Sequence, residues 1–226
     1  ELKQSDNHSL AMDYVPGIDF FIGKNHNGNF FNGYLDDFRI FNRILDATEI
    51  LGLYQDSTTY TPPTLEDGLV AFYPFNGNAI DESINNNNGT IYGAQLSNDR
   101  FDVTGRSYSF NGSTDYIDIG NDPSLKMTEK LSISAWVNPN VFPLSSYHNI
   151  ISDHGEGNNN TKVLRFYQNA VEFLLGPEGS TEARYVFPNS IANQWQHIVA
   201  TYDGSFMRLF LNGAIVDSVV RTGTIT

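Results

Sequence analysis

The sequence of 226 residues contains no cysteine. The chain therefore has no disulfide frame, no thiolate metal site and no cysteine nucleophile. Basic residues are scarce as well: Lys and Arg number 13 against 26 Asp and Glu, which gives a formal net charge of −13. A field of that sign repels phosphate backbones and anionic lipid, so we expect no nucleic-acid partner.

Long apolar runs are also missing. No stretch approaches the roughly 20 apolar residues that a membrane helix needs, and we expect no membrane insertion. Helix signals are nearly absent. One helix start is evident at Asp46, where Glu49 follows three residues later in the pattern of a capping box.

Aromatic residues and glycines are plentiful, with 16 Phe, 12 Tyr and 19 Gly. The glycines mostly separate short apolar runs, which is typical of strands joined by tight turns. We predict an all-β fold, a two-sheet antiparallel β-sandwich of the jelly-roll type. Its strands are expected at 18–25, 33–41, 69–75, 107–112, 116–120, 131–139, 149–153, 163–168, 170–176 and 183–188, and a three-stranded meander at 195–220 with turns at Asp203-Gly204 and Asn212-Gly213.

One stretch has the composition of a linker. Residues 57–68, "STTYTPPTLEDG", are rich in Ser and Thr and contain two consecutive prolines. We therefore divide the chain into residues 1–56, which hold two strands and the short helix, the linker 57–68, and a main body at 69–226. Two strands cannot bury a core alone, so residues 1–56 need the sheets of the main body.

Five segments together carry a family resemblance. They are "AFYPFNGNAIDESINNNNGTIYGA" (71–94), "SYSFNGSTDYIDIG" (107–120), "LSISAWVNP" (131–139), "WQHIVATYDGSFMRLFLNG" (195–213) and "FIGKNHNGNFFNGYLDDFRIFNRILDATEI" (21–50). The chain resembles bacterial laminin G-like domains of the concanavalin A-like lectin/glucanase superfamily. The resemblance places the family's C-terminal segment, residues 1–50, before its N-terminal segment, residues 69–226.

Two accounts explain this order. The chain is a window cut from a tandem array of near-identical repeats, which we favour, or it is a circular permutant. In both, residues 1–50 fill the sheets that residues 69–226 leave open. They do so within one chain or by segment swapping between copies, which would produce self-association.

The resemblance implies a calcium ion, which takes oxygen ligands. Asn78, Asp81 and Ser83 supply oxygen donors in the polar loop "NGNAIDES", and the resemblance implies that the ion joins this loop to Asp36 of the closing strand. The alternative is that Asp81 caps an Asx turn and that Asp36 accepts hydrogen bonds from protein groups.

Strand alternation supports the choice of Asp36. It alternates with Phe38 and Ile40, so we expect its carboxylate to point with the core face while that of Asp37 points away. A carboxylate that points inward needs a partner, and a cation would supply one.

A sugar-binding surface needs exposed aromatic rings beside polar side chains on loops. The candidates are Tyr147 and His148 in "PLSSYHN", and Asn158, Asn159 and Asn160 after "DHGEG". The alternative is ordinary aromatic packing in a loop and an Asn-rich turn.

The sequence offers no catalytic constellation. Glycosidases need two carboxylates across one bond, but Glu172 stands alone in "AVEFLL" and is expected to face solvent or to pair across a sheet. His197 is expected to make a structural hydrogen bond. We therefore predict a non-catalytic binding or adhesion module of a secreted or cell-surface bacterial protein that recognises a glycan or another surface ligand. The alternatives are a spacer repeat of a large adhesin and an accessory domain of a glycoside hydrolase.

Overall fold

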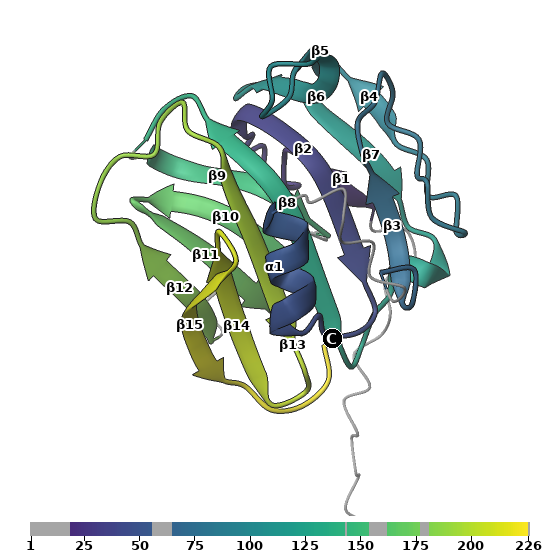
Figure 1. The fold of residues 1–226 in the computed structure, drawn as a ribbon, viewed down its shortest axis with the longest axis vertical. Helices are drawn as coiled ribbons and strands as arrows, with labels where there is room; N and C mark the ends of the chain where they lie inside the picture. The colour runs from purple at the N-terminus through teal and green to yellow at the C-terminus, as the bar shows by residue number, and fades with distance from the viewer. Residues whose placement is uncertain (1–18, 56–64, 143, 154–161, 177–180, 226) are drawn as a thin grey trace, which may run out of the picture.

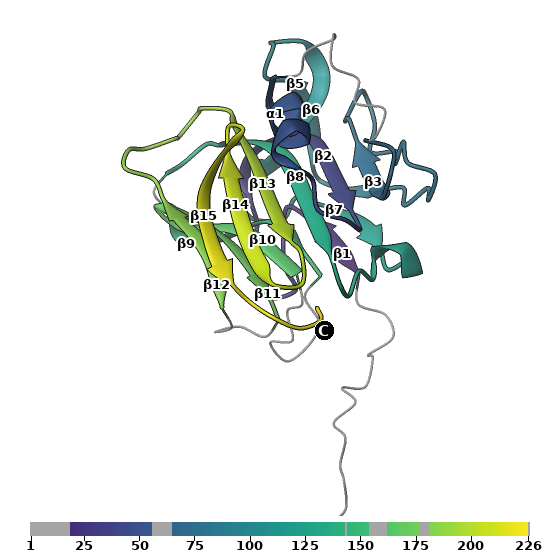
Figure 2. The same cartoon turned by 60° about the horizontal axis from the view of Figure 1, so that its bottom comes forward.

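A computed structural model describes residues 19–55, 65–142, 144–153, 162–176 and 181–225 of the protein. In these residues two antiparallel sheets pack face to face around a shared hydrophobic core (Figures 1 and 2). Strands make up most of the ordered structure, and the predicted all-β sandwich is confirmed.

One sheet has seven strands. In spatial order these are β12 (Glu182–Val186), β11 (Ala170–Leu175), β10 (Lys162–Gln168), β9 (Leu144–Ser152), β1 (Phe20–Ile22), β7 (Tyr116–Gly120) and β4 (Thr90–Tyr92). The strand β4 therefore forms one edge of this sheet.

The other sheet has eight strands. In spatial order these are β15 (Ala214–Val220), β14 (Phe206–Leu211), β13 (Gln196–Tyr202), β8 (Leu131–Pro139), β2 (Asn32–Phe41), β6 (Thr104–Asn111) and β5 (Gln95–Asn98), and β3 (Leu69–Tyr73) also pairs with β2.

The two N-terminal strands occupy central positions. β1 pairs with β7 on one side and β9 on the other, and β2 pairs with β8, β6 and β3. Ile22, Leu35 and Phe38 of these strands are completely buried in the shared core. The structure thus completes both sheets within one chain, and segment swapping stays a prediction. The division at the linker stays a prediction too, and residues 57–64 of that linker lie outside the described residues.

The helix α1 (Ala47–Gln55) begins where the sequence predicts. Asp46 Oδ1 accepts hydrogen bonds from the backbone N–H groups of Thr48 (2.8 Å) and Glu49 (2.9 Å), and Glu49 Oε2 accepts one from Asp46 N–H (2.9 Å). These reciprocal bonds form the expected capping box. The helix buries Ile50 and Leu53 on the outer face of the eight-stranded sheet (Figure 2).

The strand predictions succeed where the turns are specific. β13, β14 and β15 form the predicted meander, and Asn212 and Gly213 both have positive φ. The edge strands β4 and β5 were not predicted, and a 3-10 helix, η1 (Pro123–Leu125), follows β7. β9 begins at Leu144, earlier than the expected 149, so Tyr147 and His148 lie in a strand and their assignment to a loop is wrong.

The predicted orientation of Asp36 is also wrong. The register between β2 and β8 shifts just after Asp36, and Asp37 has a φ of 50°. This bulge adds one residue to the alternation, so Leu35 and Phe38 both point into the core. Asp36 instead pairs with Trp136 on the outer face of the sheet.

Arg100 is the cation that faces Asp36. Its guanidinium makes a hydrogen-bonded ion pair with the Asp36 carboxylate, and its Nη2 lies 2.8 Å from Asp37 Oδ2. The guanidinium also lies 4.8 Å from the ring centroid of Trp136. When Asp36 is ionised, its counter-charge therefore comes from the protein.

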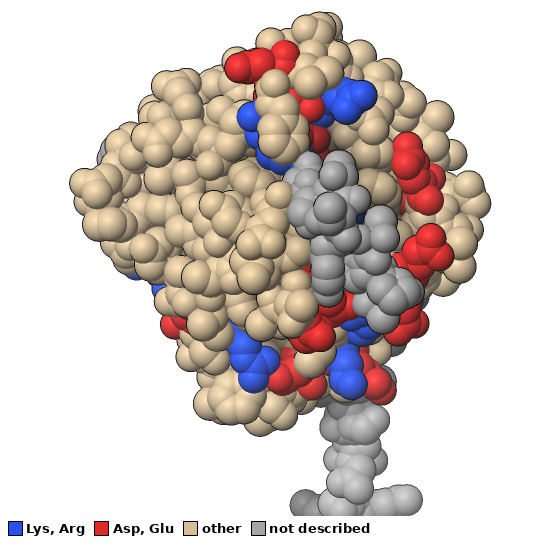
Figure 3. Space-filling view, viewed as in Figure 1, with Lys and Arg blue, Asp and Glu red and all other residues tan. Residues whose placement is uncertain are grey.

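The face that carries α1 shows no continuous basic patch (Figure 3). Charged side chains gather at the top, on the right and in the lower part of that view, and the area to the left of α1 is mostly uncharged. The described part of the chain contains no helix with the length and hydropathy of a membrane span.

Candidate functional site

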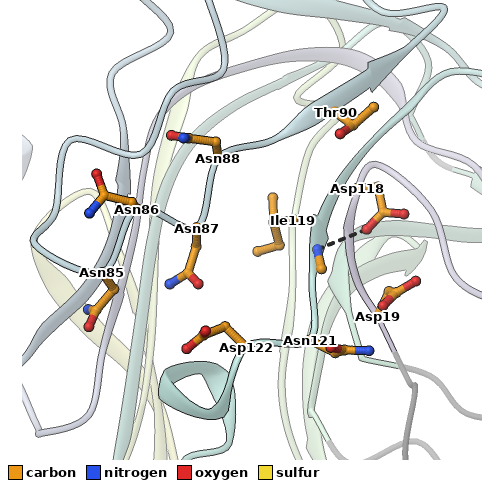
Figure 4. Close-up of a pocket in the computed structure, with 11 residues that line it drawn as sticks. Asp19, Asn85, Asn86, Asn87, Asn88, Thr90, Asp118, Ile119, Asn121 and Asp122 are labelled. Carbon is orange, nitrogen blue, oxygen red and sulfur yellow. Dashed lines mark hydrogen bonds between the residues drawn. The ribbon is translucent and has the colours of Figure 1, made fainter.

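A polar cleft opens at one end of the seven-stranded sheet, with a volume of about 450 Å³. Figure 4 shows an asparagine loop along one side and Asp118 and Asp19 on the opposite side. The cleft is lined by Asp19, Asn85, Asn86, Asn87, Asn88, Thr90, Asp118, Ile119, Gly120, Asn121 and Asp122.

Asp81 holds the asparagine loop in place. Its carboxylate accepts backbone N–H bonds from Phe72, Ser83 and Asn87, each 2.8 Å long, and one from the Ser83 hydroxyl, also 2.8 Å. Asp81 is only 3% exposed and Asn87 only 5%, although most of the loop around them is exposed or half-buried. The buried Asp81 carboxylate fixes the loop, because a backbone N–H group that moved away from it would lose its hydrogen-bond acceptor.

The amide of Asn87 anchors the loop to the rest of the domain. Its Nδ2 donates to Val70 O and to Ser124 Oγ, each over 3.1 Å. Asn86 adopts a φ of 57°, which asparagine tolerates better than most residues. The side chains of Asn86 and Asn88 are exposed at the cleft, so the loop presents amide groups on a fixed backbone.

The opposite side comes from the end of β7 and the turn after it. Asp118 Oδ1 accepts a hydrogen bond from Gly120 N–H at 2.9 Å, and Asp122 Oδ1 caps η1 by accepting one from Ser124 N–H at 2.8 Å. Among the described residues, the Asn121 side chain between them has no hydrogen bond. Each carboxylate is thus hydrogen-bonded to the backbone, and the Ser124 side chain also hydrogen-bonds to Asp122.

The carboxylates of the cleft lie in different electrostatic environments. Partial burial raises the pKa of Asp118 above its usual value, and the nearby Asp19 adds to this effect. Hydrogen bonds from Ser124 lower the pKa of Asp122. Burial lowers the pKa of Lys24, whose ammonium is attracted by Asp118 and Asp19. Three carboxylates thus line the cleft, with Lys24 and Lys126 close to them.

Such an arrangement suits a neutral polyhydroxylated ligand. Carboxylate oxygens accept hydrogen bonds from hydroxyl groups, and an amide both donates and accepts them. A volume in this range matches small-ligand sites, and the fixed amides and carboxylates would orient a sugar by its hydroxyls.

The structure does not gather the four predicted calcium ligands. Asp81 and Ser83 are bonded to each other, Asn78 Oδ1 accepts a bond from Ile80 N–H at 2.8 Å and its side chain is exposed, and Asp36 is paired with Arg100. Each of the two carboxylate oxygens of Asp81 accepts two hydrogen bonds, which matches the Asx-turn alternative rather than an open set of calcium ligands. Within the described ranges, no group of three or more His, Cys, Asp or Glu side chains is placed to hold a metal ion.

Calcium stays a prediction that one measurement tests. The melting temperature of the purified protein is compared in millimolar calcium and in chelator. Binding to the folded state alone would raise it by mass action. Equal melting temperatures in the two buffers would contradict the predicted calcium site.

Tyr147 and His148, two of the predicted ligand-binding residues, do not line the cleft. Tyr147 is half-buried on β9, its ring centroid lies 4.4 Å from that of Tyr167, and the Arg165 guanidinium lies 3.8 Å from its ring centroid. Burial lowers the pKa of the neighbouring His148. Asn158, Asn159 and Asn160 lie outside the described residues.

Glu172 is not solvent-facing, although it does pair across the sheet. It is 3% exposed, and its carboxylate lies 2.8 Å from Arg165 Nε and 3.1 Å from Arg184 Nε. His197 makes the expected structural contact, with its Nε2 2.9 Å from Ser134 Oγ.

Sequence reasoning missed the residues that line the cleft. The run of asparagines at 85–88 was visible, but nothing local places it against "DIGND" at 118–122. The one feature of the sequence that could have indicated the cleft is the cluster of asparagines directly before Thr90, where β4 begins. The pairing of Thr90 with Asp118 then brings the two segments together.

Comparison with protein families identifies the family of this chain. The laminin G type 3 family model, described as the concanavalin A-like lectin/glucanases superfamily, matches residues 111–226. No curated protein matches the chain. The match includes Asp118 and Asp122 of the cleft, whereas Asp19 and the asparagine loop lie before it. Because the family model covers more than half of the chain and the fold is the corresponding two-sheet sandwich, the protein belongs to the concanavalin A-like lectin/glucanase superfamily.

Proposed function

We propose that this chain is a non-catalytic glycan-binding module that works at the cell surface or outside the cell. The cleft supports this proposal, because it combines fixed amides and carboxylates at one end of the seven-stranded sheet of a lectin-type sandwich. Family membership supports carbohydrate binding in general, and fold alone does not identify a ligand. Adhesion is the role that we propose for such binding.

The cleft residues provide the first test. The chain is screened on an array of immobilised glycans, and positive glycans are titrated by calorimetry. Asn121→Ala and Asp118→Asn are each expected to weaken binding about tenfold, because each removes hydrogen bonds to a ligand hydroxyl worth about 1.4 kcal/mol. Asp118→Asn keeps the acceptor for Gly120 N–H and so preserves the turn.

A matched control is available on β5. Asn98 is exposed and does not line the cleft, so Asn98→Ala is expected to bind as the wild type does. Equal losses in Asn98→Ala and Asn121→Ala would show that the cleft is not the site. A blank array from a folded protein would contradict glycan binding itself and favour the spacer role in a large adhesin.

The same preparation tests the absence of catalysis. Two carboxylates with opposite pKa shifts in one cleft are also what a glycosidase uses, so turnover has to be measured. We expect positive glycans to stay intact after prolonged incubation. Released sugar that disappears in Asp118→Asn would make the chain an enzyme.

A further inference from the structure

A stack of aromatic rings stands beside the cleft on the same face of the seven-stranded sheet. The rings of Tyr92 and Tyr116 are nearly parallel, with 4.5 Å between centroids and 9° between planes. Phe21 meets the Tyr116 ring edge to face at 5.7 Å. The stack belongs to β4, β7 and β1, the strands that also lead into the cleft.

Register places the stack next to the cleft. Tyr92 pairs with Tyr116, and Thr90 pairs with Asp118, two residues along each strand. Residues two apart on a strand point to the same face and are separated by roughly 6.6 Å. A ring at that distance would lie beside a ligand that extends from the cleft by one further sugar unit.

Lys24 links the stack to the carboxylates. Its Nζ lies 3.7 Å from the ring centroid of Tyr116 and 4.1 Å from that of Phe21, and the same ammonium is attracted by Asp118 and Asp19. The amine therefore contacts two rings and is attracted electrostatically by two carboxylates. The ammonium packs against the Tyr116 ring, and we do not expect it to bind an anionic ligand.

Tyr92 is the accessible member of the stack. It lies on the edge strand β4 and is 45% exposed, while Tyr116 behind it is half-buried. Among the described residues no other ring stacks on Tyr92. A tyrosine fixed on one side and open on the other presents a flat apolar surface with a hydroxyl at its rim.

We propose that Tyr92 forms a second subsite of the cleft, and that together they bind a neutral oligosaccharide of at least two sugar units. This inference rests on the proposed function. The cleft would take one sugar by its hydroxyls, and the apolar C–H face of the next sugar would lie on the Tyr92 ring. Asp19, Asp118 and Asp122 outnumber Lys24 and the nearby Lys126, and this excess of carboxylates selects against uronate, sialylated and sulfated glycans.

The probe is the immobilised glycan array, sorted into neutral and anionic glycans, followed by calorimetry with the mono-, di- and trisaccharide of each positive glycan. We expect neutral glycans to bind, with the disaccharide roughly three- to tenfold tighter than the monosaccharide. Tyr92→Ala is expected to remove this gain and to leave monosaccharide binding unchanged. Tyr92→Phe keeps the ring and is expected to keep the gain.

Ile91→Ala is the matched control, since Ile91 is 41% exposed on the same strand and points to the other face. Near-ultraviolet circular dichroism checks that each variant is folded. The comparison of mono-, di- and trisaccharide binding to the wild-type protein tests the second subsite without any variant. A blank array overturns the proposed function. Binding that is confined to anionic glycans, equal affinities for mono- and disaccharide, or an undiminished gain in Tyr92→Ala would overturn this inference while glycan binding stands.

Discussion

A chain shortened to residues 57–226 is expected to show no cooperative unfolding transition, although it keeps β3 to β15. The measurement is urea unfolding followed by tryptophan fluorescence and far-ultraviolet circular dichroism. Both tryptophans, at positions 136 and 195, remain in the shortened chain, so the two chains can be compared by the same signal.

The reason is that the deleted strands lie inside both sheets. Without β1, the strands β9 and β7 lose their common neighbour, and without β2 the same happens to β8 and β6. Ile22, Leu35 and Phe38 also leave the core. Each fully buried side chain of this kind contributes about 1.5–3 kcal/mol, and a whole domain has only about 5–15 kcal/mol of net stability.

Complementation separates this explanation from a general effect of truncation. A separate fragment of residues 1–56 is expected to restore the transition when it is mixed with residues 57–226. The fragment with Leu35→Asp is expected to fail because it places a charge in the core, whereas Thr48→Ala, which changes an exposed position on α1, is expected to succeed. A wild-type-like transition of residues 57–226 alone would contradict the argument.

The molecular mass of the protein in solution tests whether residues 1–50 complete the sheets of their own chain or those of another copy. A strictly monomeric and cooperatively folded protein would exclude segment swapping. An oligomer that resists dilution to monomer would exclude closure within one chain.

The sequence predicts those parts of the fold that are encoded by local chemistry. The capping box of Asp46 and Glu49 needs only two residues at the right spacing, and the Asn212-Gly213 turn needs residues that accept positive φ. The bulge at Asp37 is different. An aspartate with φ of 50° in the middle of a strand reflects pairing with β8 and β6, and alternation counted along one strand therefore assigned Asp36 to the wrong face.

The candidate site was less predictable, because it is assembled from distant segments. Asn86 and Asp118 meet at one cleft only because β4 pairs with β7, and β4 is a three-residue edge strand with no alternation to detect. Burial of Asp81 likewise depends on donors that come from both ends of a long loop. Side-chain composition indicated a polar binding surface, but the contacts that shape it are tertiary.

A second prediction concerns two buried titratable groups on the outer face of the eight-stranded sheet, where His197 and Asp36 both flank Trp136. His197 is 1% exposed, and its ring centroid lies 5.2 Å from that of Trp136. Burial, together with the charges of Arg39 and Arg100, lowers its pKa to about 3. Burial and the neighbouring Asp37 raise the pKa of Asp36 to about 7, against the opposing effect of Arg100.

The two shifts act on stability with opposite signs. Between pH 3 and 6.5 the unfolded chain protonates His197 and the folded chain does not, so this residue costs stability as the pH falls through 6.5. Between about pH 4 and 7 the folded chain protonates Asp36 and the unfolded chain does not, so this residue costs stability as the pH rises. Each contribution is on the order of 4 kcal/mol over its window, and in the wild type they largely cancel between pH 4 and 6.5.

Single substitutions are therefore expected to expose opposite slopes. Relative to the wild type, the free energy of unfolding of His197→Gln should rise by about 3 kcal/mol from pH 7 to pH 4, and that of Asp36→Asn should fall by about 4 kcal/mol from pH 8 to pH 4. Gln and Asn are both neutral at every pH. Any packing energy that is lost on substitution is therefore the same at each pH, and it shifts the curve of unfolding free energy against pH without changing its slope. Urea titrations at pH 4, 5.5, 7 and 8 measure these differences. Curves that run parallel to the wild type within about 0.5 kcal/mol would show that neither group changes its protonation on folding.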